Sequence, residues 1–463
     1  MKNKIIFFIK CIMVMLPFIL ISLYARMNMM GYTDEEAPYY LWNREVCQNK
    51  TGHSYDVLIL GDSEANTAYL PEVLSDSCVN LSLGGTTPME NYYTLKEYLK
   101  YNDAPKAVFI SFMDFHFQTS DCYWIRTMYS HRYSACDNWE MLQEARRHDE
   151  SSIWSESAYL DWISYELFLP DKYIASLSNG GFNQRLEGNT GTRYFYDIHD
   201  GRYIDRTVKE APIIVDYHSF FVNPLFDDYY RKLLALCAEN GIHVHLIKLP
   251  LPASDTFSEE YVQGFEQYFE AIKEAFPGVT VDWWDSYEDR LFTDSCHLNI
   301  HGALRFTREL KEKYSEDFNN TYSGHQLAGL DDYFSIENHL DELINWLDAC
   351  PDYAAVVCDT VGDFPDRYEK DYKRPNVALT DCAFSGRAAG IYVLEDTADR
   401  AAFDQIFPDG DELISIYPGD GTCYNWNPYG IHGVNVLVIN TSSGEIVCEK
   451  KFLYVNDEFV LQG

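Results

Sequence analysis

Basic side chains are few in this 463-residue chain, in which 36 Lys and Arg stand against 72 Asp and Glu, for a formal net charge of −36. A surface this acidic repels the phosphate backbones of DNA and RNA. The composition therefore excludes nucleic acid as an expected partner, although it says nothing about the fold.

Metal and redox motifs are also missing. None of the 12 cysteines stands in a C-x-x-C pair, which argues against a zinc ribbon and against a thioredoxin-type site. His297 and His301 have an H-x-x-x-H spacing, but no Glu follows the first His as it does in the zinc-binding H-E-x-x-H motif. We therefore predict no metal site and no cofactor.

Apolar and aromatic residues, by contrast, are plentiful, at 46% and 16% of the chain. This composition can bury a large core and is unlike that of a disordered chain. The length suggests two or three domains of roughly 150 residues each.

The N-terminus carries the longest apolar run. Ile5–Tyr24 is broken only by Lys10 and Pro17, and Lys2 and Lys4 precede it. A membrane span needs ~20 apolar residues, and flanking lysines favour a cytoplasmic N-terminus. The alternative is a cleaved signal peptide, but no A-x-A-like cleavage site follows. Both interpretations place residues 26–463 outside the cytoplasm, and the first predicts a single-pass protein of the cell membrane.

Composition and rhythm divide the chain into four segments. The predicted segments are a membrane anchor or signal segment over 1–25, a polar stalk over 26–50, an α/β domain over 51–318 with an insertion at about 117–215, and a smaller C-terminal α+β domain over 325–463.

Short apolar strands alternate with helical stretches in the α/β domain. The predicted strands are Asp56–Leu60, Cys78–Leu83, Ala107–Phe112, His243–Pro250 and Val279–Asp285, and the predicted helices include Met89–Tyr101, Asp227–Asn240, Tyr261–Ala275 and Gly302–Lys313. This alternation predicts a parallel sheet covered on both faces. Ligands of such sheets bind beyond the carboxyl ends of the strands.

Two other stretches have different patterns. The insertion is rich in Tyr and Trp, with a helix expected around Ser157–Leu169, and either covers the substrate or elaborates the structure. In the C-terminal domain we expect a helix over Ile336–Leu347, a strand over Ala354–Asp359 and a β-hairpin over Gly433–Phe452.

The first strand of the α/β domain runs into a glycine, a carboxylate and a hydroxyl. In "VLILGDSEAN", Gly61, Asp62 and Ser63 follow the apolar residues. Ser63 is either a cap of the next helix or a nucleophile at the rim of the sheet. A serine nucleophile needs a base, and the base needs an orienting group. Asp294 and His297, in "TDSCHLNIHGALRFT", have the spacing for that pair.

Together these motifs resemble the SGNH (GDSL) hydrolase family over roughly residues 52–318. The block "HLNIHGALRFT" is similar to that of its membrane-anchored bacterial branch, which includes D-alanyl-lipoteichoic-acid transfer and alginate O-acetyltransferase-type proteins. The resemblance implies an SGNH-like fold with Ser63 as nucleophile, His297 as general base and then acid, and Asp294 as its orienting group. It also implies an oxyanion hole formed by the backbone N–H groups of Ser63 and Gly84.

The chain departs from the family at one place. Many members carry an Asn after the third strand, where this chain reads "ISFMDFHF". Ser111, Asp114 or His116 could take its place, although none is an amide. The absence favours acyl transfer, or a site of reduced activity, over free hydrolysis. Asn66 and Asn299 are candidate substrate contacts, with surface or capping roles as the alternative.

The sequence thus predicts an extracytoplasmic serine acyltransferase or esterase. It would move acetyl or D-alanyl groups on a cell-envelope polysaccharide, and the family branch implies a membrane-bound O-acyltransferase as partner. The alternatives are a non-catalytic glycan-binding or scaffold protein on the same fold, and a plain carbohydrate esterase.

Overall fold

The computed structural model divides the chain into two compact units, residues 1–327 and 328–463. The described residues of the first unit are 2–33, 37–52, 54–75, 77–167, 181–198, 201 and 214–318. Those of the second are 340, 343–344, 347, 353–359, 390–395, 414–416, 424–426, 433–440, 445–455 and 458–462. Residues 319–324, which separate the two predicted domains, fall outside these residues.

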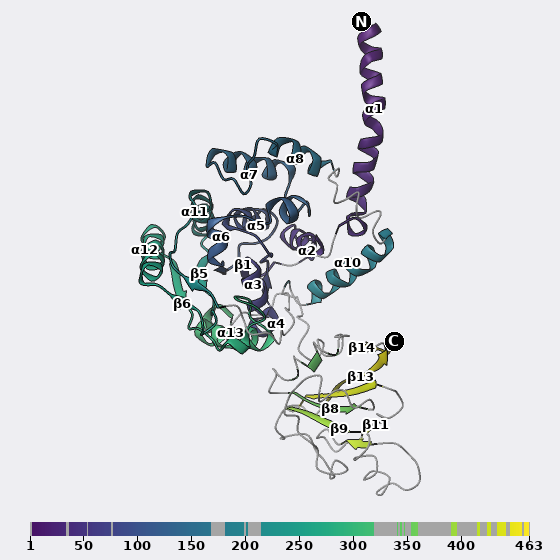
Figure 1. Cartoon of the computed structure of the whole chain (residues 1–463), viewed down its shortest axis with the longest axis vertical. Coiled ribbons are helices and arrows are strands. Elements are labelled where there is room, and N and C mark those ends of the chain that lie inside the picture. The colour runs from purple at the N-terminus through teal and green to yellow at the C-terminus, as the bar shows by residue number, and fades with distance from the viewer. Residues whose placement is uncertain are drawn as a thin grey trace. The chain divides into compact units, whose positions relative to one another are not determined.

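A five-stranded parallel sheet forms the centre of the first unit (Figure 1). Its order is β2-β1-β3-β5-β7, with β1 Val57–Gly61, β2 Cys78–Asn80, β3 Ala107–Ser111, β5 His243–Lys248 and β7 Val279–Trp283. Each strand overlaps a predicted one, so the predicted parallel α/β sheet is confirmed. Every residue of β1 and β3 is buried, as expected for strands covered on both faces.

Successive side chains of a strand point to opposite faces of the sheet. Leu58, Val108 and Leu246 belong to the core cluster on one face. Among the helices that contribute to this cluster are α5 Pro88–Tyr101, α11 Pro224–Glu239 and α12 Glu259–Ala275. Phe109 points the other way, where it lies near Tyr69 and stacks on Phe318. The helices α3 Ser63–Ala68, α4 Pro71–Leu74 and α13 Ile300–Lys313 contact one another near this second face.

The predicted polar stalk is wrong. This segment forms a short turn of helix, η1 Met29–Gly31, and an eleven-residue helix, α2 Ala37–Cys47. Trp42 and Val46 belong to the main core cluster, and Asn43 Nδ2 donates to the carbonyl of Leu81 at 2.7 Å. The two apolar residues are four positions apart and so share one helix face, which outweighs the polar character of the rest.

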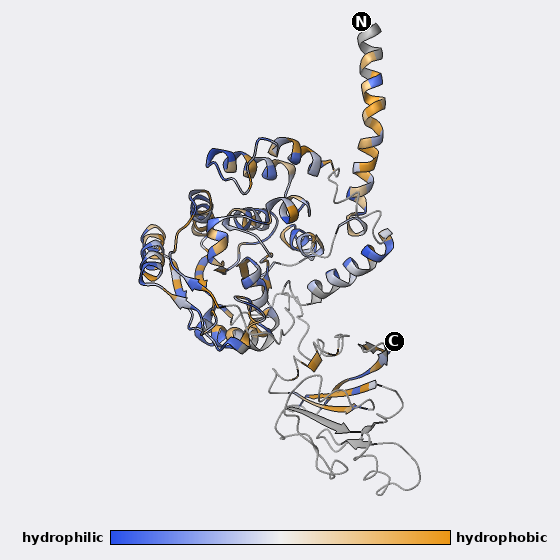
Figure 2. Ribbon diagram, viewed as in Figure 1, coloured by the Kyte–Doolittle hydropathy of each residue, from blue (hydrophilic) through white to orange (hydrophobic). Residues whose placement is uncertain are grey.

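The N-terminal helix α1, Lys2–Met27, is apolar along most of its length (Figure 2). Its segment Ile9–Met27 is long and apolar enough to cross a membrane, by length and composition. Its C-terminal end is fastened to the first unit. Arg26 Nη2 donates to the carbonyl of Glu166 at 2.6 Å, and Ala25 packs with Tyr129.

The aromatic insertion is largely helical. It contains the π-helix η2 Tyr123–Met128 and the helices α7 Ala135–Arg147, α8 Ala158–Glu166 and α10 Gly181–Ile198. The predicted helix around Ser157–Leu169 matches α8. Tyr123 and Met128 pack with Met89 of α5 and Tyr229 of α11, so this part of the insertion joins the body of the unit. Residues 168–180 and 202–213 lie outside the described residues.

Several short elements complete this unit. They are α6 Asp114–Gln118, β4 Asp216–Tyr217, β6 Thr256–Phe257, η3 Asp289–Leu291 and α14 Ser315–Phe318.

The second unit contains a five-stranded sheet of order β14-β13-β12-β8-β9, in which only β8 and β9 pair in parallel. Its strands are β8 Tyr353–Asp359, β9 Gly390–Glu395, β12 Gly433–Asn440, β13 Ile446–Val455 and β14 Glu458–Leu461, and a separate pair joins β10 Ile414–Ile416 to β11 Tyr424–Trp426. The antiparallel pairing of β12 with β13 confirms the predicted hairpin strands. Their turn, residues 441–444, and most of the helix predicted over Ile336–Leu347 lie outside the described residues.

Candidate active site

The turn after β1 requires a glycine. Gly61 has a φ of +152°, and a β-carbon there would lie 2.0 Å from the carbonyl oxygen of Ser111 on β3. Asn91 of α5 holds the same residue from the other side, because its Oδ1 accepts from the Gly61 N–H at 2.9 Å. The strand end is thus fixed in a position that only glycine can occupy.

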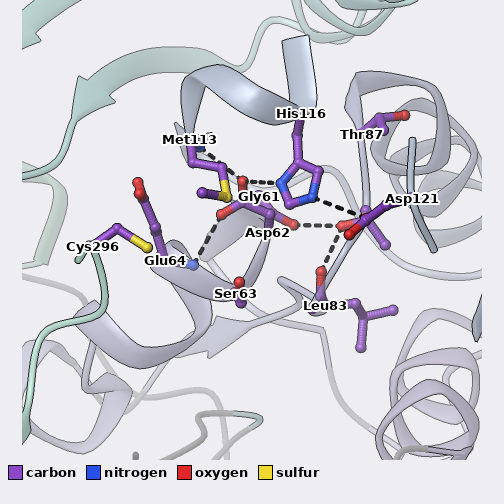
Figure 3. A network of polar contacts seen from close by, with 12 residues as sticks. Gly61, Asp62, Ser63, Glu64, Leu83, Thr87, Met113, His116, Asp121 and Cys296 are labelled. Atoms are coloured by element: carbon purple, nitrogen blue, oxygen red, sulfur yellow. Dashed lines mark hydrogen bonds and ion pairs between the residues drawn. The ribbon is translucent and has the colours of Figure 1, made fainter. Parts of the chain in front are cut away.

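Asp62 is the buried hub of a polar network (Figure 3). One carboxylate oxygen caps α3 by accepting from the Glu64 N–H at 2.9 Å. The other accepts from the Met113 N–H at 2.8 Å and lies 2.7 Å from Nδ1 of His116. On the far side of that ring, Nε2 of His116 lies 3.7 Å from a carboxylate oxygen of Asp121, beyond hydrogen-bond distance but close enough for charge attraction.

Ser63, the first residue of α3, meets His297 across 234 positions of sequence. Oγ of Ser63 lies 2.8 Å from Nε2 of His297, and Nδ1 of that ring lies 2.7 Å from Oδ2 of Asp294. Because Nδ1 faces a carboxylate, it carries the ring proton, which leaves Nε2 to accept from the Ser63 hydroxyl. This is the order of contacts that a serine nucleophile, a base and an orienting group require.

In the D-x-x-H motif, the side chain of Asp294 accepts hydrogen bonds from the backbone of the turn that follows it. Oδ1 of Asp294 accepts from the N–H groups of Cys296, at 2.9 Å, and His297, at 2.8 Å. Partial burial would raise the pKa of Asp294, but these bonds and the His297 ring lower it well below its usual range. Asp294 therefore stays ionised beside the imidazole.

Two backbone N–H groups belong to residues beside the nucleophilic side chain: that of Ser63 itself and that of Gly84, where an added β-carbon would lie 3.7 Å from Cβ of Ser63. Among the described residues, no protein acceptor takes the N–H of Ser63 or that of Gly84. The turn that carries Gly84 is held by Thr86, whose hydroxyl donates to the carbonyls of Gly61 and Leu83, at 2.8 and 2.7 Å. Both N–H groups are therefore available to a developing oxyanion.

The side-chain amides of Asn66 and Asn299 form hydrogen bonds within the protein. Nδ2 of Asn66 donates to two backbone carbonyls and its Oδ1 accepts from the Tyr196 hydroxyl, each at 2.9 Å. Oδ1 of Asn299 accepts from the Gly302 N–H in the first turn of α13, at 3.1 Å. Both side chains are buried, which favours the capping and structural alternative over substrate contact at these positions.

The three residues considered as substitutes for the missing amide all bond elsewhere. Oγ of Ser111 pairs with the hydroxyl of Tyr69 at 2.7 Å. Asp114 accepts from Nζ of Lys248 at 3.0 Å and from the Tyr261 hydroxyl. His116 faces Asp62, as described above.

Glu64, next to the nucleophile, is a feature that the sequence analysis missed. Its side chain is buried, and Figure 3 shows it on the Cys296 side of α3, away from His116. Burial, reinforced by the charge of Asp62, raises the pKa of Glu64 to about 8, against the opposing effect of Lys248 and His297. The carboxyl is therefore mostly protonated at neutral pH.

One set of donor atoms near the nucleophile has the spacing of a metal site. Those of Asp294, Cys296 and His297 lie within 4.8 Å of one another. Burial raises the pKa of the Cys296 thiol well above its usual value, whereas a metal would require the thiolate. A metal would also displace the proton between His297 and Asp294, so we assign these groups to hydrogen bonding.

Two raised pKa values predict how stability depends on pH. Burial alone would lower the pKa of His116, but the carboxylates of Asp121 and Asp62 raise it to about 9. A base with a raised folded-state pKa stabilises fully below its unfolded value of about 6.5, and this stability is lost as the pH rises through 9. Glu64 changes the stability in the same direction. Its raised pKa favours the neutral acid, so its ionisation as the pH rises through 8 also lowers the free energy of unfolding.

We therefore expect the free energy of unfolding of the whole chain to fall between pH 6 and pH 9.5. The loss should be on the order of a few kcal/mol, because each pKa difference between the folded and unfolded states contributes to stability. Denaturant titration at each pH measures it. The Glu64→Gln variant, which mimics the neutral acid, should lose only the part due to His116. A wild-type stability that is flat or rising over this range would contradict both assignments.

No family model and no curated protein matches the chain. A solved structure from Streptococcus pneumonia, provisionally described as that of a platelet activating factor, is 13% identical. The match covers 64% of this chain and 97% of that chain, with a TM-score of 0.30. A likeness at this TM-score carries no argument about function, so the inferences that follow depend on the geometry of the site.

Proposed function

We propose that the chain is a serine-dependent acyl hydrolase or acyltransferase of the SGNH type. The observation that carries the proposal is the continuous line of contacts from Oγ of Ser63 to His297, 2.8 Å, and from His297 to Asp294, 2.7 Å. The position of Ser63 at the carboxyl end of a central parallel strand, where ligands of such sheets bind, also supports it.

The first half of the reaction forms an acyl-enzyme. As the Ser63 oxygen bonds to the acyl carbon, its proton moves to Nε2 of His297 and the carbonyl electrons move onto oxygen. The N–H groups of Ser63 and Gly84 stabilise that oxyanion. When the carbonyl re-forms, the bond to the leaving alkoxide breaks, and the alkoxide takes the proton from His297.

The second half regenerates the serine. His297 takes a proton from water or from a sugar hydroxyl, whose oxygen bonds to the acyl carbon. The bond between the acyl carbon and Ser63 Oγ then breaks, and the serine oxygen takes the proton back from His297. Water gives hydrolysis and releases a free acid, whereas a sugar hydroxyl gives transfer. We propose transfer of acetyl or D-alanyl groups on a cell-envelope polysaccharide, supported by the apolar helix α1 and by the missing amide after β3.

The proposal extends to the location and partner of the protein. Helix α1 would anchor the chain in the cell membrane with residues 26–463 on the extracytoplasmic side. A membrane-bound O-acyltransferase that delivers the acyl group through the membrane would then supply the donor for Ser63.

Labelling by a fluorophosphonate tests the proposal. The full-length chain in detergent should be labelled at Ser63, and Ser63→Ala should not be labelled, because the probe bonds only to an activated serine. Ser120→Ala, which alters another buried serine, is the control and should be labelled like the wild type. Equal labelling of the wild type and Ser63→Ala would remove the proposal. Absence of wild-type labelling would favour a non-catalytic, glycan-binding protein.

Whether the acyl group is hydrolysed or transferred is a separate measurement. With an acetyl donor and a soluble oligosaccharide acceptor, an acyltransferase produces acetylated sugar, whereas an esterase produces only free acetate. The acetate-only result would identify a carbohydrate esterase and overturn the transfer part of the proposal.

A further inference from the structure

The insertion brings an arginine to the glycine turn beside the nucleophile. Arg126 belongs to the π-helix η2 of the aromatic insertion. A β-carbon on Gly84 would lie 3.2 Å from Nη1 of Arg126 and 3.7 Å from Cβ of Ser63. The guanidinium and the Ser63 side chain therefore both lie next to the α-carbon of Gly84, the glycine whose N–H is a candidate oxyanion donor.

Two glycines make room for this approach. A β-carbon on Gly85 would lie 3.1 Å from the same Nη1 and 2.5 Å from Sγ of Cys122, and Gly85 has a φ of +75°. A side chain at Gly84 would also crowd the guanidinium. The "LGG" sequence therefore permits contact between this turn and η2, in addition to the close approach of an acyl oxygen.

The π-helix is held firmly enough to position its arginine. Thr127, the next residue, donates from its hydroxyl to Oε1 of Glu90 on α5 at 3.2 Å. The Tyr123 hydroxyl donates to the carbonyl of Asn138 at 3.2 Å, and Nε1 of Trp124 donates to the carbonyl of Ile153 at 3.1 Å. Single-turn π-helical segments occur often at functional sites.

Among the residues that the structure describes, the other candidate donors for an oxyanion in this site are backbone N–H groups. Ser111, Asp114 and His116 are bonded to other groups, and the loop after β3 directs the Met113 N–H to Asp62. A guanidinium has five N–H donors and a permanent positive charge. It can thus supply both a hydrogen bond and a charge at the place where negative charge develops.

We propose that Arg126 is a catalytic residue that completes the oxyanion hole, as the third donor in place of the missing amide. This inference rests on the proposed function of Ser63. As the bond between Ser63 Oγ and the acyl carbon forms, the negative charge on the carbonyl oxygen is shared by the N–H groups of Ser63 and Gly84 and by the Arg126 guanidinium.

The test is the turnover of p-nitrophenyl acetate by the full-length chain. Arg126→Ala should lower kcat about 10²–10³-fold, the usual loss for one oxyanion donor, with little change in KM. Added methylguanidine should restore part of the rate. Arg147→Ala removes the same side chain from the surface of α7, where it pairs with Glu144, and should turn over like the wild type.

A second substrate separates this role from recognition of an anionic substrate. Mono-p-nitrophenyl succinate carries a carboxylate on its acyl group. An oxyanion donor lowers the rate for the acetate and the succinate by similar factors. A loss confined to the succinate would overturn the proposal in favour of an anion-binding subsite.

Labelling kinetics distinguish the failure of this inference from the failure of the proposed function. The fluorophosphonate should react with Ser63 of Arg126→Ala at least tenfold more slowly than with the wild type. An unchanged labelling rate overturns the role of Arg126 and leaves that of Ser63 intact. A wild-type chain that is not labelled at all overturns both.

Discussion

Replacing His297 with Ala is expected to lower kcat for p-nitrophenyl acetate about 10⁶-fold, or to the level of the uncatalysed reaction. In the proposed mechanism the imidazole, 2.8 Å from Oγ of Ser63, takes the Ser63 proton and returns it to the leaving group. The described groups around Ser63 Oγ offer no second base at that distance. Without His297, only the proposed oxyanion donors, the N–H groups of Ser63 and Gly84 and the guanidinium of Arg126, would continue to assist the reaction.

Under the proposed mechanism Asp294 acts only by orienting His297, so the losses in kcat from Asp294→Ala and His297→Ala should not add. Asp294→Ala alone should cost about 10⁴-fold, because the imidazole loses its orienting partner but remains in place. The double variant should be no slower than His297→Ala. A double variant much slower than His297→Ala would show that Asp294 has a role of its own.

The control for this series is His243→Ala. His243 is the exposed first residue of β5, at the amino end of the sheet and so opposite the edge that carries Ser63. It should retain wild-type kcat. If His297→Ala keeps more than a tenth of the wild-type rate, the base has been assigned wrongly.

Replacing Asp62 is expected to have the largest effect on folding. Its fully buried carboxylate bonds to the N–H of Glu64, the N–H of Met113 and the ring of His116. Removal leaves a buried positive charge without its nearest partner, for which losses of about 3–5 kcal/mol are typical. Asp62→Ala should therefore lower the free energy of unfolding by about that amount.

Related variants separate the charge from the hydrogen bonds. Asp62→Asn keeps an acceptor for the N–H groups and should lose less than Asp62→Ala. Asp56→Asn makes the same chemical change where the carboxylate pairs with exposed Lys106 at 2.8 Å, and should lose no more than ~1 kcal/mol. Denaturant titration measures all three. Equal losses at positions 62 and 56 would contradict the buried ion pair.

The parts of the fold that the sequence predicted depend on local pattern. The strands of the central sheet are short apolar runs bounded by helical segments, and this alternation is visible without knowledge of their partners. The prediction of a stalk around α2 was wrong because the average composition of the segment is polar, although one face of the helix is apolar and buries Trp42 and Val46. Composition averages over a helix, whereas packing depends on one side of it.

The same distinction applies to the site. Ser63, Asp294 and His297 stand in short motifs and are the residue types that a nucleophile, its base and an orienting group require, so the sequence alone singles them out. Asn91 and Arg126 carry no such signal. Asn91 is one polar residue within α5, and Arg126 lies in a π-helix whose proximity to Gly84 arises only from the packing of the insertion. Contacts of this kind appear only when the chain is folded.

Under the proposed function, the contacts at the end of α1 also bear on which substrates Ser63 could reach. The bond from Arg26 to Glu166 and the packing of Ala25 on Tyr129 leave no slack between the last turn of that helix and the body that carries Ser63. If α1 lies in a bilayer as proposed, Ser63 would be held close to the membrane surface instead of on a long flexible tether. Under the proposed function, polysaccharide far from the membrane surface would reach Ser63 only by moving towards the membrane.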